Sequence, residues 1–129
     1  MKTCLSALAI LALAFTLSAD QTALVKIGTG DAAKFFNKEM IVTGTVAQVS
    51  IRPKLVFLNM DKPYPDSPFT LVIFSAATNQ FGDLKALKGT SVEATGVITN
   101  YHDRAEMVLT TSNQLKVTGP APTNSASTM

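Results

Sequence analysis

The chain has little of what most catalytic and metal sites require. Its 129 residues include one cysteine, one histidine and no tryptophan. The cysteine, Cys4, lies in an apolar N-terminal stretch, so a chain that loses this stretch can form no disulfide. His102 and Asp103 are adjacent, but these two ligands are fewer than a protein metal site uses. We therefore expect no metal, no other cofactor and a fold that depends on core packing.

Motifs of catalysis are missing as well. The sequence has no glycine-rich phosphate loop, no Ser-His-acid arrangement with supporting motifs and no pair of carboxylates in an evident cleft. Charge is scarce and balanced, since 11 basic and 9 acidic residues give a net charge of +2. Tight nucleic-acid binding usually comes with a clearly basic face. These absences predict a binding protein and not an enzyme, and they give no electrostatic case for high affinity toward a polyanion.

The first 19 residues have the order of a secretory signal peptide. Lys2 is their only charge, an apolar run extends from Leu5 to Leu17, and small residues precede the polar Asp20. A membrane-spanning helix needs about 20 apolar residues, and this run is shorter. We expect cleavage after Ala19, a periplasmic or secreted protein, and no membrane span once the leader is removed. Because Leu17 stands where a small residue is preferred, an uncleaved anchor is the alternative.

The other end of the chain is polar. Residues 119–129 carry no charge and no apolar period, which predicts a disordered tail. The remaining residues, 20–118, are enough for one domain with its own core and too few for two. We therefore expect a single folded domain between the leader and the tail.

Alternating apolar residues, and in residues 69–74 a near-continuous apolar run, predict five strands in this domain. The first and the fourth carry a central glycine, Gly44 and Gly96, where a small sheet usually has a bulge or a bend that lets one strand serve two sheets. The expected strands are residues 40–51, 55–60, 69–74, 90–99 and 105–109, with a closing extended piece at 115–118.

Two short helices and two loops complete the expected order. Residues 31–38 begin with Asp31, a residue type that caps helices, and predict a short N-terminal helix. Residues 75–87 predict a second short helix between the third and fourth strands. Three prolines make residues 61–68 a loop, and residues 100–104 form the hairpin loop between the last two strands.

This order of elements resembles the OB-fold, a five-stranded Greek-key barrel. The resemblance implies an all-β fold: a five-stranded OB-fold barrel with a short helix between strands three and four and a short N-terminal helix. More specifically, several runs are similar to small exported bacterial OB-fold domains that are usually labelled nucleic-acid-binding and occur alone after a signal peptide or beside nuclease domains. Those runs are Phe57-Leu58-Asn59, Tyr64-Pro65, Phe69 to Phe74 and Arg104-Ala105-Glu106.

Two further groups of OB-fold proteins bear on the interpretation. In size, leader and topology, the chain also resembles exported OB-fold proteins of bacterial envelopes that are associated with stress tolerance. Thermonuclease-type enzymes use a similar barrel, but the arginine and acidic cluster that their chemistry requires does not form a recognisable motif here. The resemblance therefore implies binding and not catalysis.

The OB-fold resemblance implies a binding face on strands two and three, framed by the loops after strands one and four. There, exposed aromatic rings would stack on bases or sugars and cations would contact phosphates. Phe57 has the core as its alternative place, because phenylalanine is usually buried. Asp103 lies in the second of these framing loops, and Asp61 and Asp66 lie in the loop over residues 61–68; all three reduce the positive field. The candidate binding residues are Arg52, Lys54, Phe57, Asn59, Tyr64, Tyr101 and Arg104.

Three functions fit these residues. The first is an exported OB-fold module that weakly binds single-stranded nucleic acid or a similar polyanion. The alternative is a periplasmic or envelope protein that binds a small ligand or a protein partner, which the balanced charge and the leader favour. The third is a structural accessory domain derived from a larger nuclease. Arg104 and Glu106 lie two residues apart on one strand face, where we expect each to pair with the other or with a neighbour, in a structural role and not a catalytic one.

Overall fold

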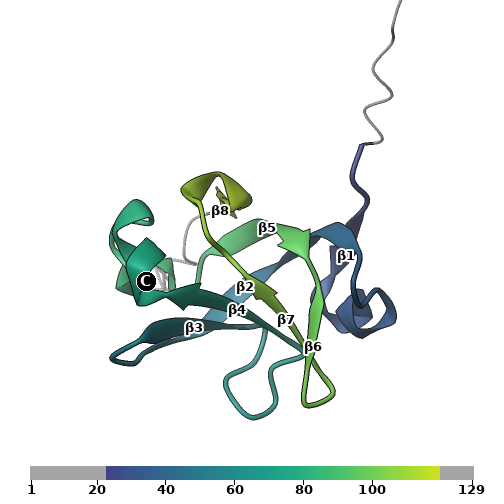
Figure 1. Cartoon of the computed structure of the whole chain (residues 1–129), viewed down its shortest axis with the longest axis horizontal. Helices are drawn as coiled ribbons and strands as arrows, with labels where there is room; N and C mark the ends of the chain where they lie inside the picture. Colours follow the sequence, from purple (N-terminus) through teal and green to yellow (C-terminus); the bar gives the residue numbers. More distant parts are fainter. Residues whose placement is uncertain (1–22, 120–129) are drawn as a thin grey trace, which may run out of the picture.

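The computed structural model describes residues 23–119. The expected signal peptide and residues 120–129 of the expected tail lie outside the described residues. Gly119, where the tail was expected to begin, is the last residue of a strand. Within residues 23–119 the chain forms eight strands and four short 3-10 helices (Figure 1).

The strands form one open sheet in the order β6-β7-β4-β3-β2-β5-β8, with β1 beside β2. Neighbours are antiparallel except β4 with β7 and β1 with β2, which are parallel. The strands are β1 (Lys26–Gly28), β2 (Glu39–Ile51), β3 (Leu55–Met60), β4 (Phe69–Phe74), β5 (Ser91–Val97), β6 (Thr99–Tyr101), β7 (Arg104–Val108) and β8 (Leu115–Gly119); the 3-10 helices are η1 (Thr29–Lys34), η2 (Ser75–Gln80), η3 (Leu84–Leu87) and η4 (Ser112–Gln114).

The long strand β2 serves two parts of the sheet, as the sequence predicted. Its first half, as far as Thr45, pairs with β5, and its second half, from Val46, pairs with β3. The register shifts between Val46 and Gln48, next to the point where β2 changes partner. Gly44 lies just before this point, and a Cβ there would approach Cγ2 of Thr29 to 2.7 Å. Glycine is therefore the residue that lets β2 pass close to the segment packed against it.

The fourth expected strand, residues 90–99, is interrupted at Ile98. The N–H of Ile98 donates to the carbonyl O of Lys38 at 3.0 Å, and its own carbonyl accepts from the N–H of Asn37 at 2.7 Å. Ile98 is absent from the registers of both strand pairs, and its side chain is fully buried. As a result β5 pairs with β2, whereas β6 pairs with β7.

The prediction of a five-stranded barrel is therefore wrong in strand number and in closure. The fold is all-β and OB-like, but the break at Ile98 leaves an open sheet whose order begins at β6 and ends at β8. Two further strands arise at the ends of the described chain: β1 adds in parallel to β2, and β8 adds to β5. The second of these is the closing extended piece that the sequence predicted.

The two expected helices are shorter than predicted and are 3-10 helices. The N-terminal one, η1, ends at Lys34 instead of continuing to Lys38. The expected helix over residues 75–87 is divided into η2 and η3. Gly82 lies between them with a φ of 68°, in the left-handed region that a right-handed helix cannot include.

Strand alternation separates the core from the opposite face of β3, β4 and β7. Leu58, Leu71 and Met107 point to the core and are fully buried. Phe69 is also fully buried, whereas Phe57 is only half-buried and lies on the opposite face. The sheet thus has one side that is closed by packing and another side that is available for a site.

Candidate ligand-binding groove

A groove of about 900 Å³ runs across the face of β3, β4 and β7 that points away from the core. Along each strand, the residues that form the groove floor alternate with core residues, because successive side chains of a strand point to opposite faces. Polar and apolar side chains are mixed along it. The lining residues are Gln48, Ser50, Arg52, Leu55, Phe57, Asn59, Tyr64, Thr70, Val72, Phe74, Thr99, Asn100, Tyr101, His102, Arg104, Glu106 and Val108.

The structure brings six of the seven candidate residues together in this groove. Arg52 comes from the turn after β2, and Tyr101 and Arg104 come from the hairpin between β6 and β7. Lys54, in the same turn as Arg52, is exposed and is not among the lining residues. The other lining residues from the sequence prediction are Phe57, Asn59 and Tyr64.

Tyr64 and Arg104 close one end of the groove. The guanidinium carbon of Arg104 lies 4.9 Å from the centre of the Tyr64 ring, which is a cation–π contact. Nη2 of Arg104 also donates to the carbonyl O of Pro65 at 3.0 Å. Arg104 therefore ties the proline-rich loop to β7, and in Figure 1 this loop and the β6–β7 hairpin project from the same side of the sheet.

The two tyrosine rings remain accessible. Tyr64 is 66% exposed and Tyr101 is 58% exposed. The ring of Tyr101 packs edge-on against His102, with ring centres 4.3 Å apart. Large exposed aromatic side chains beside a groove offer flat surfaces on which a ring of a ligand can stack.

The turn of the β6–β7 hairpin contains fewer residues than the expected loop over residues 100–104. His102 and Asp103 form a two-residue turn with φ values of 50° and 64°, the left-handed pair that matches the twist of a hairpin. The N–H of Asp103 donates to Oδ1 of Asn100 at 2.9 Å. Tyr101 and Arg104 consequently face each other as a cross-strand pair at the groove.

The side chain of Asn59 forms hydrogen bonds to both strands that flank β3. Its Nδ2 donates to Oε1 of Gln48 at 2.9 Å, and its Oδ1 accepts from Oγ1 of Thr70 at 2.9 Å. The same Gln48 oxygen accepts from the backbone N–H of Tyr64 at 2.9 Å. Asn59 is only 3% exposed. The residue predicted to contact a ligand therefore positions the floor and the Tyr64 loop.

Glu106 is the acidic residue that lines the groove. Burial raises the pKa of its carboxyl above the ordinary value of 4.5, although the positive charges of Arg104 and His102 act in the opposite direction. Of the two arrangements expected for Arg104, a pair with Glu106 or a bond to a neighbour, the structure shows the second, since Arg104 donates to the carbonyl O of Pro65. Within residues 23–119 the ion pairs are Lys26 with Glu93 and Lys34 with Asp31.

Several lining residues were not among the sequence candidates. Glu106, Gln48, Thr70 and His102 belong to this group. Alternation along β7 identifies Glu106, because it lies two residues from Arg104 on the same face. The positions of Gln48 and Thr70 in the groove depend on strand register, which the local sequence pattern does not predict.

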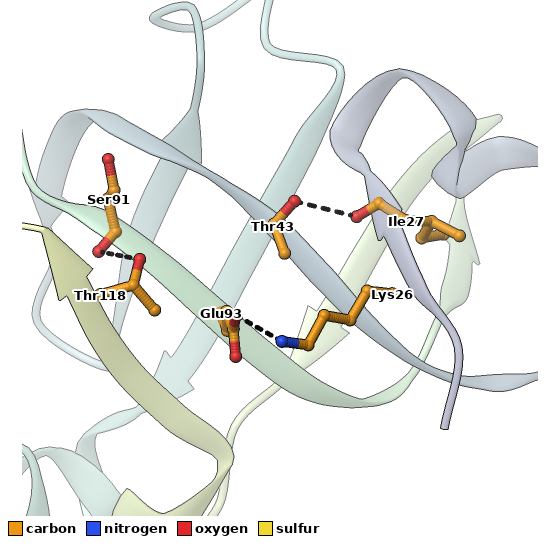
Figure 2. Close-up of polar contacts among 6 residues, drawn as sticks. All are labelled: Lys26, Ile27, Thr43, Ser91, Glu93 and Thr118. Carbon is orange, nitrogen blue, oxygen red and sulfur yellow. Dashed lines mark hydrogen bonds and ion pairs between the residues drawn. The ribbon is translucent and has the colours of Figure 1, made fainter. Parts of the chain in front are cut away.

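The outer surface of β1, β2, β5 and β8 has a different character. Figure 2 shows Nζ of Lys26 at 3.0 Å from Oε1 of Glu93, an ion pair that bridges β1 and β5. On the same surface Oγ1 of Thr43 donates to the carbonyl O of Ile27 at 3.3 Å. Oγ1 of Thr118 donates to the carbonyl O of Ser91 at 3.2 Å. On this outer surface, polar side chains thus form hydrogen bonds or ion pairs with neighbouring strands.

Across residues 23–119, no three or more histidine, cysteine, aspartate or glutamate side chains gather closely enough to hold a metal ion. Over the same range, no helix has the length and apolar character that a membrane crossing requires.

Comparison with known proteins shows likeness at the level of fold. No family model matches the sequence, and no curated protein matches it. Among solved structures, the asparaginyl-tRNA synthetase of Entamoeba histolytica is 23% identical, with a TM-score of 0.51, over 78% of this chain and 25% of that chain. The same enzyme in complex with asparaginyl-adenylate is 23% identical, with a TM-score of 0.53, over 77% and 25%.

A third solved structure gives the same result. A protein described as an aspartyl-tRNA synthetase from Leishmania major Friedlin is 11% identical, with a TM-score of 0.55, over 81% of this chain and 23% of that chain. The chain thus spans about a quarter of the length of each synthetase. At these identities the likeness shows a shared fold with one part of the synthetases.

Proposed function

We propose that the chain is a binding module, not an enzyme, and that it weakly binds single-stranded nucleic acid in the groove. One observation carries this proposal: two exposed tyrosines and two arginines border a single groove on an OB-like sheet. Tyr64 and Tyr101 would stack on bases, while Arg52 and Arg104 would contact phosphates. The proposal is also supported by the fold shared with synthetases whose names state that they act on tRNA.

Weak binding follows from the small number of cations. Two arginines line the groove, and Glu106 opposes them. For single strands the logarithm of affinity falls against the logarithm of salt concentration with a slope of about 0.7 per neutralised phosphate, so two contacts give a slope of about 1.4. We therefore expect measurable binding at low salt and little binding at high salt.

The direct experiment is fluorescence anisotropy of a labelled oligo(dT) titrated with the protein at several salt concentrations. Stacking on an aromatic side chain contributes about 1–3 kcal/mol per base, so Tyr101→Ala should lower the affinity at least fivefold without changing the melting temperature. Lys116→Ala, on β8 and outside the groove lining, is the matched control and should bind as the wild type does. Absence of binding at low salt, or binding that salt does not weaken, contradicts the proposal.

A second candidate is a binding protein for a small ligand or a protein partner. Its support is the apolar part of the groove, to which Leu55, Val72 and Val108 contribute alongside Phe57. Ligand sites of this size are usually apolar with a few placed polar groups. A thermal-shift screen against oligonucleotides, oligosaccharides and nucleotides separates the two candidates, because a ligand that prefers the native state raises the melting temperature.

Export is part of the same proposal and is supported by the first 19 residues. Expression of the full chain in a bacterium, followed by mass spectrometry of the periplasmic fraction, tests it. The expected product begins at Asp20. A product that retains Met1 and stays in the cytoplasm contradicts export without affecting the proposed groove.

A further inference from the structure

Several polar groups of the groove are already engaged within the protein. Gln48, Asn59 and Thr70 bond to one another, as described above. Arg104 is bonded to Pro65 and stacked on Tyr64. These groups therefore have part of their hydrogen-bonding capacity already satisfied when a ligand enters the groove.

The carboxylate of Glu106 is different. Its strand neighbours are Thr70 on β4 and Thr99 on β6. The hydroxyl of Thr70 donates to Asn59, and that of Thr99 donates to the backbone carbonyl of Glu106 at 3.1 Å. Within residues 23–119, no side chain or backbone N–H donates a hydrogen bond to the carboxylate of Glu106.

This carboxylate is nevertheless open to the groove. Among the described residues, every side-chain oxygen or nitrogen that is sealed from solvent has a hydrogen-bond partner. The oxygens of Glu106 have none, so they must be reachable from the groove that the side chain lines. Partial burial makes water a poorer substitute for a bonded donor, which is also why the pKa of this carboxyl is raised. A ligand with donors at this point would satisfy the group.

We propose that Glu106 recognises one base of the bound strand and favours guanine, an inference that rests on the proposed function. The Watson–Crick edge of guanine presents two adjacent donors, the ring N1–H and the exocyclic amino group, which match the two oxygens of a carboxylate. Adenine and cytosine place an amino group beside a ring acceptor, and thymine places its N–H between two carbonyls. An ionised carboxylate repels those acceptors. In a single strand this edge is free to be read.

The geometry of the groove supports contact with a base and not with the backbone. Glu106 lies on β7 between β4 and β6, and Tyr101 ends the adjacent strand β6. A base that stacks on Tyr101 would direct its polar edge across the floor toward Glu106. Phosphates would be repelled by the carboxylate and would instead lie near Arg52 or Arg104 at the border of the groove.

The test compares oligo(dT) with the same oligonucleotide carrying a single central guanine. A bidentate contact discriminates against the wrong base by about 1–3 kcal/mol, so guanine should raise the affinity of the wild type about tenfold. Replacing that guanine with hypoxanthine, which lacks the amino donor, should lose most of the gain. Glu106→Gln should abolish the gain, because the amide turns one of its donors toward the two donors of guanine.

Glu93→Gln provides the matched control, because it makes the same chemical change on the surface shown in Figure 2. It should keep the full preference for guanine. Equal affinity of the wild type for both oligonucleotides, or equal affinity for guanine and hypoxanthine, overturns the inference even if Glu106→Gln fails to fold. Binding of neither oligonucleotide would instead remove the proposed function, so the two failures are distinguishable.

Discussion

The outer surface of β1, β2, β5 and β8 and the groove surface of β3, β4 and β7 belong to one sheet, yet they use polar side chains differently. On the outer surface Lys26 pairs with Glu93, and threonines bond to neighbouring strands (Figure 2). In the groove two tyrosine rings are largely exposed and the carboxylate of Glu106 lacks a donor within the described residues. The first surface pairs its polar groups across strands, whereas the second leaves aromatic rings and a carboxylate accessible.

The strand β2 connects these two surfaces, so a substitution that distorts β2 should affect both. Gly44→Ala places a Cβ 2.7 Å from Cγ2 of Thr29 and 3.2 Å from Cε of Met60. Overpacking of this kind costs about 1–3 kcal/mol, which we expect as a loss in the free energy of unfolding in urea. Gly30→Ala is the control, since a Cβ there meets nothing within 4 Å. Equal stability of the two variants would show that β2 has room to move.

A substitution of Arg104 tests whether the shape of this side chain, and not only its charge, contributes to binding in the groove. Arg104→Lys keeps the charge but loses the stack on Tyr64 and the bond to Pro65. These contacts are together worth about 1 kcal/mol at an exposed site, so the affinity for oligo(dT) should fall about fivefold. The salt dependence of binding should not change. Arg52→Lys, in the turn after β2, is the comparison and should have a smaller effect; an equal effect would contradict a positioning role for Arg104.

The outer surface should tolerate substitution. Lys26→Ala removes the ion pair with Glu93, whose side chain is 19% exposed while that of Lys26 is 60% exposed. Exposed pairs of this kind contribute about 0–1 kcal/mol, so the unfolding free energy should fall by less than about 1 kcal/mol. Affinity for oligo(dT), measured by anisotropy, should stay at the wild-type value. A loss of affinity would place part of the ligand on this surface.

The smallest expected effect is the pH dependence that Glu106 introduces. Its pKa is raised in the folded protein, so the folded state retains a proton that the unfolded state loses as pH rises above 4.5. The unfolding free energy of the wild type should therefore decrease as pH rises through the interval between 4.5 and the raised pKa, and then level off. Urea unfolding of the wild type and Glu106→Gln across this interval measures the difference. Curves that stay parallel would contradict the raised pKa.

Parts of the fold were predictable from local sequence patterns. Short apolar runs bounded by turn residues predicted the bounds of β3 and β4, and proline content predicted the loop between them. The central glycine of β2 correctly predicted a strand that serves two parts of the sheet. These features are local, so the sequence within about ten residues decides them.

Other parts depend on contacts that are distant in the sequence. Ile98 continues the apolar alternation of β5, and only its backbone bonds to Asn37 and Lys38 break the strand. β1 is a three-residue strand that exists because β2 offers an edge for pairing. Asn59 looked like a ligand contact, but its partners Gln48 and Thr70 come from neighbouring strands. Register and long-range pairing decide these cases.

The most direct test of the groove is an NMR titration of the isotope-labelled protein with unlabelled oligo(dT) at low salt. The account predicts that changes in amide chemical shift concentrate at Phe57, Tyr101 and Arg104. The amide shifts of Lys26 and Glu93, on the outer surface, should stay unchanged. Shifts that gather around Lys26 and Glu93, or a spectrum that the oligonucleotide leaves unaltered, would contradict it.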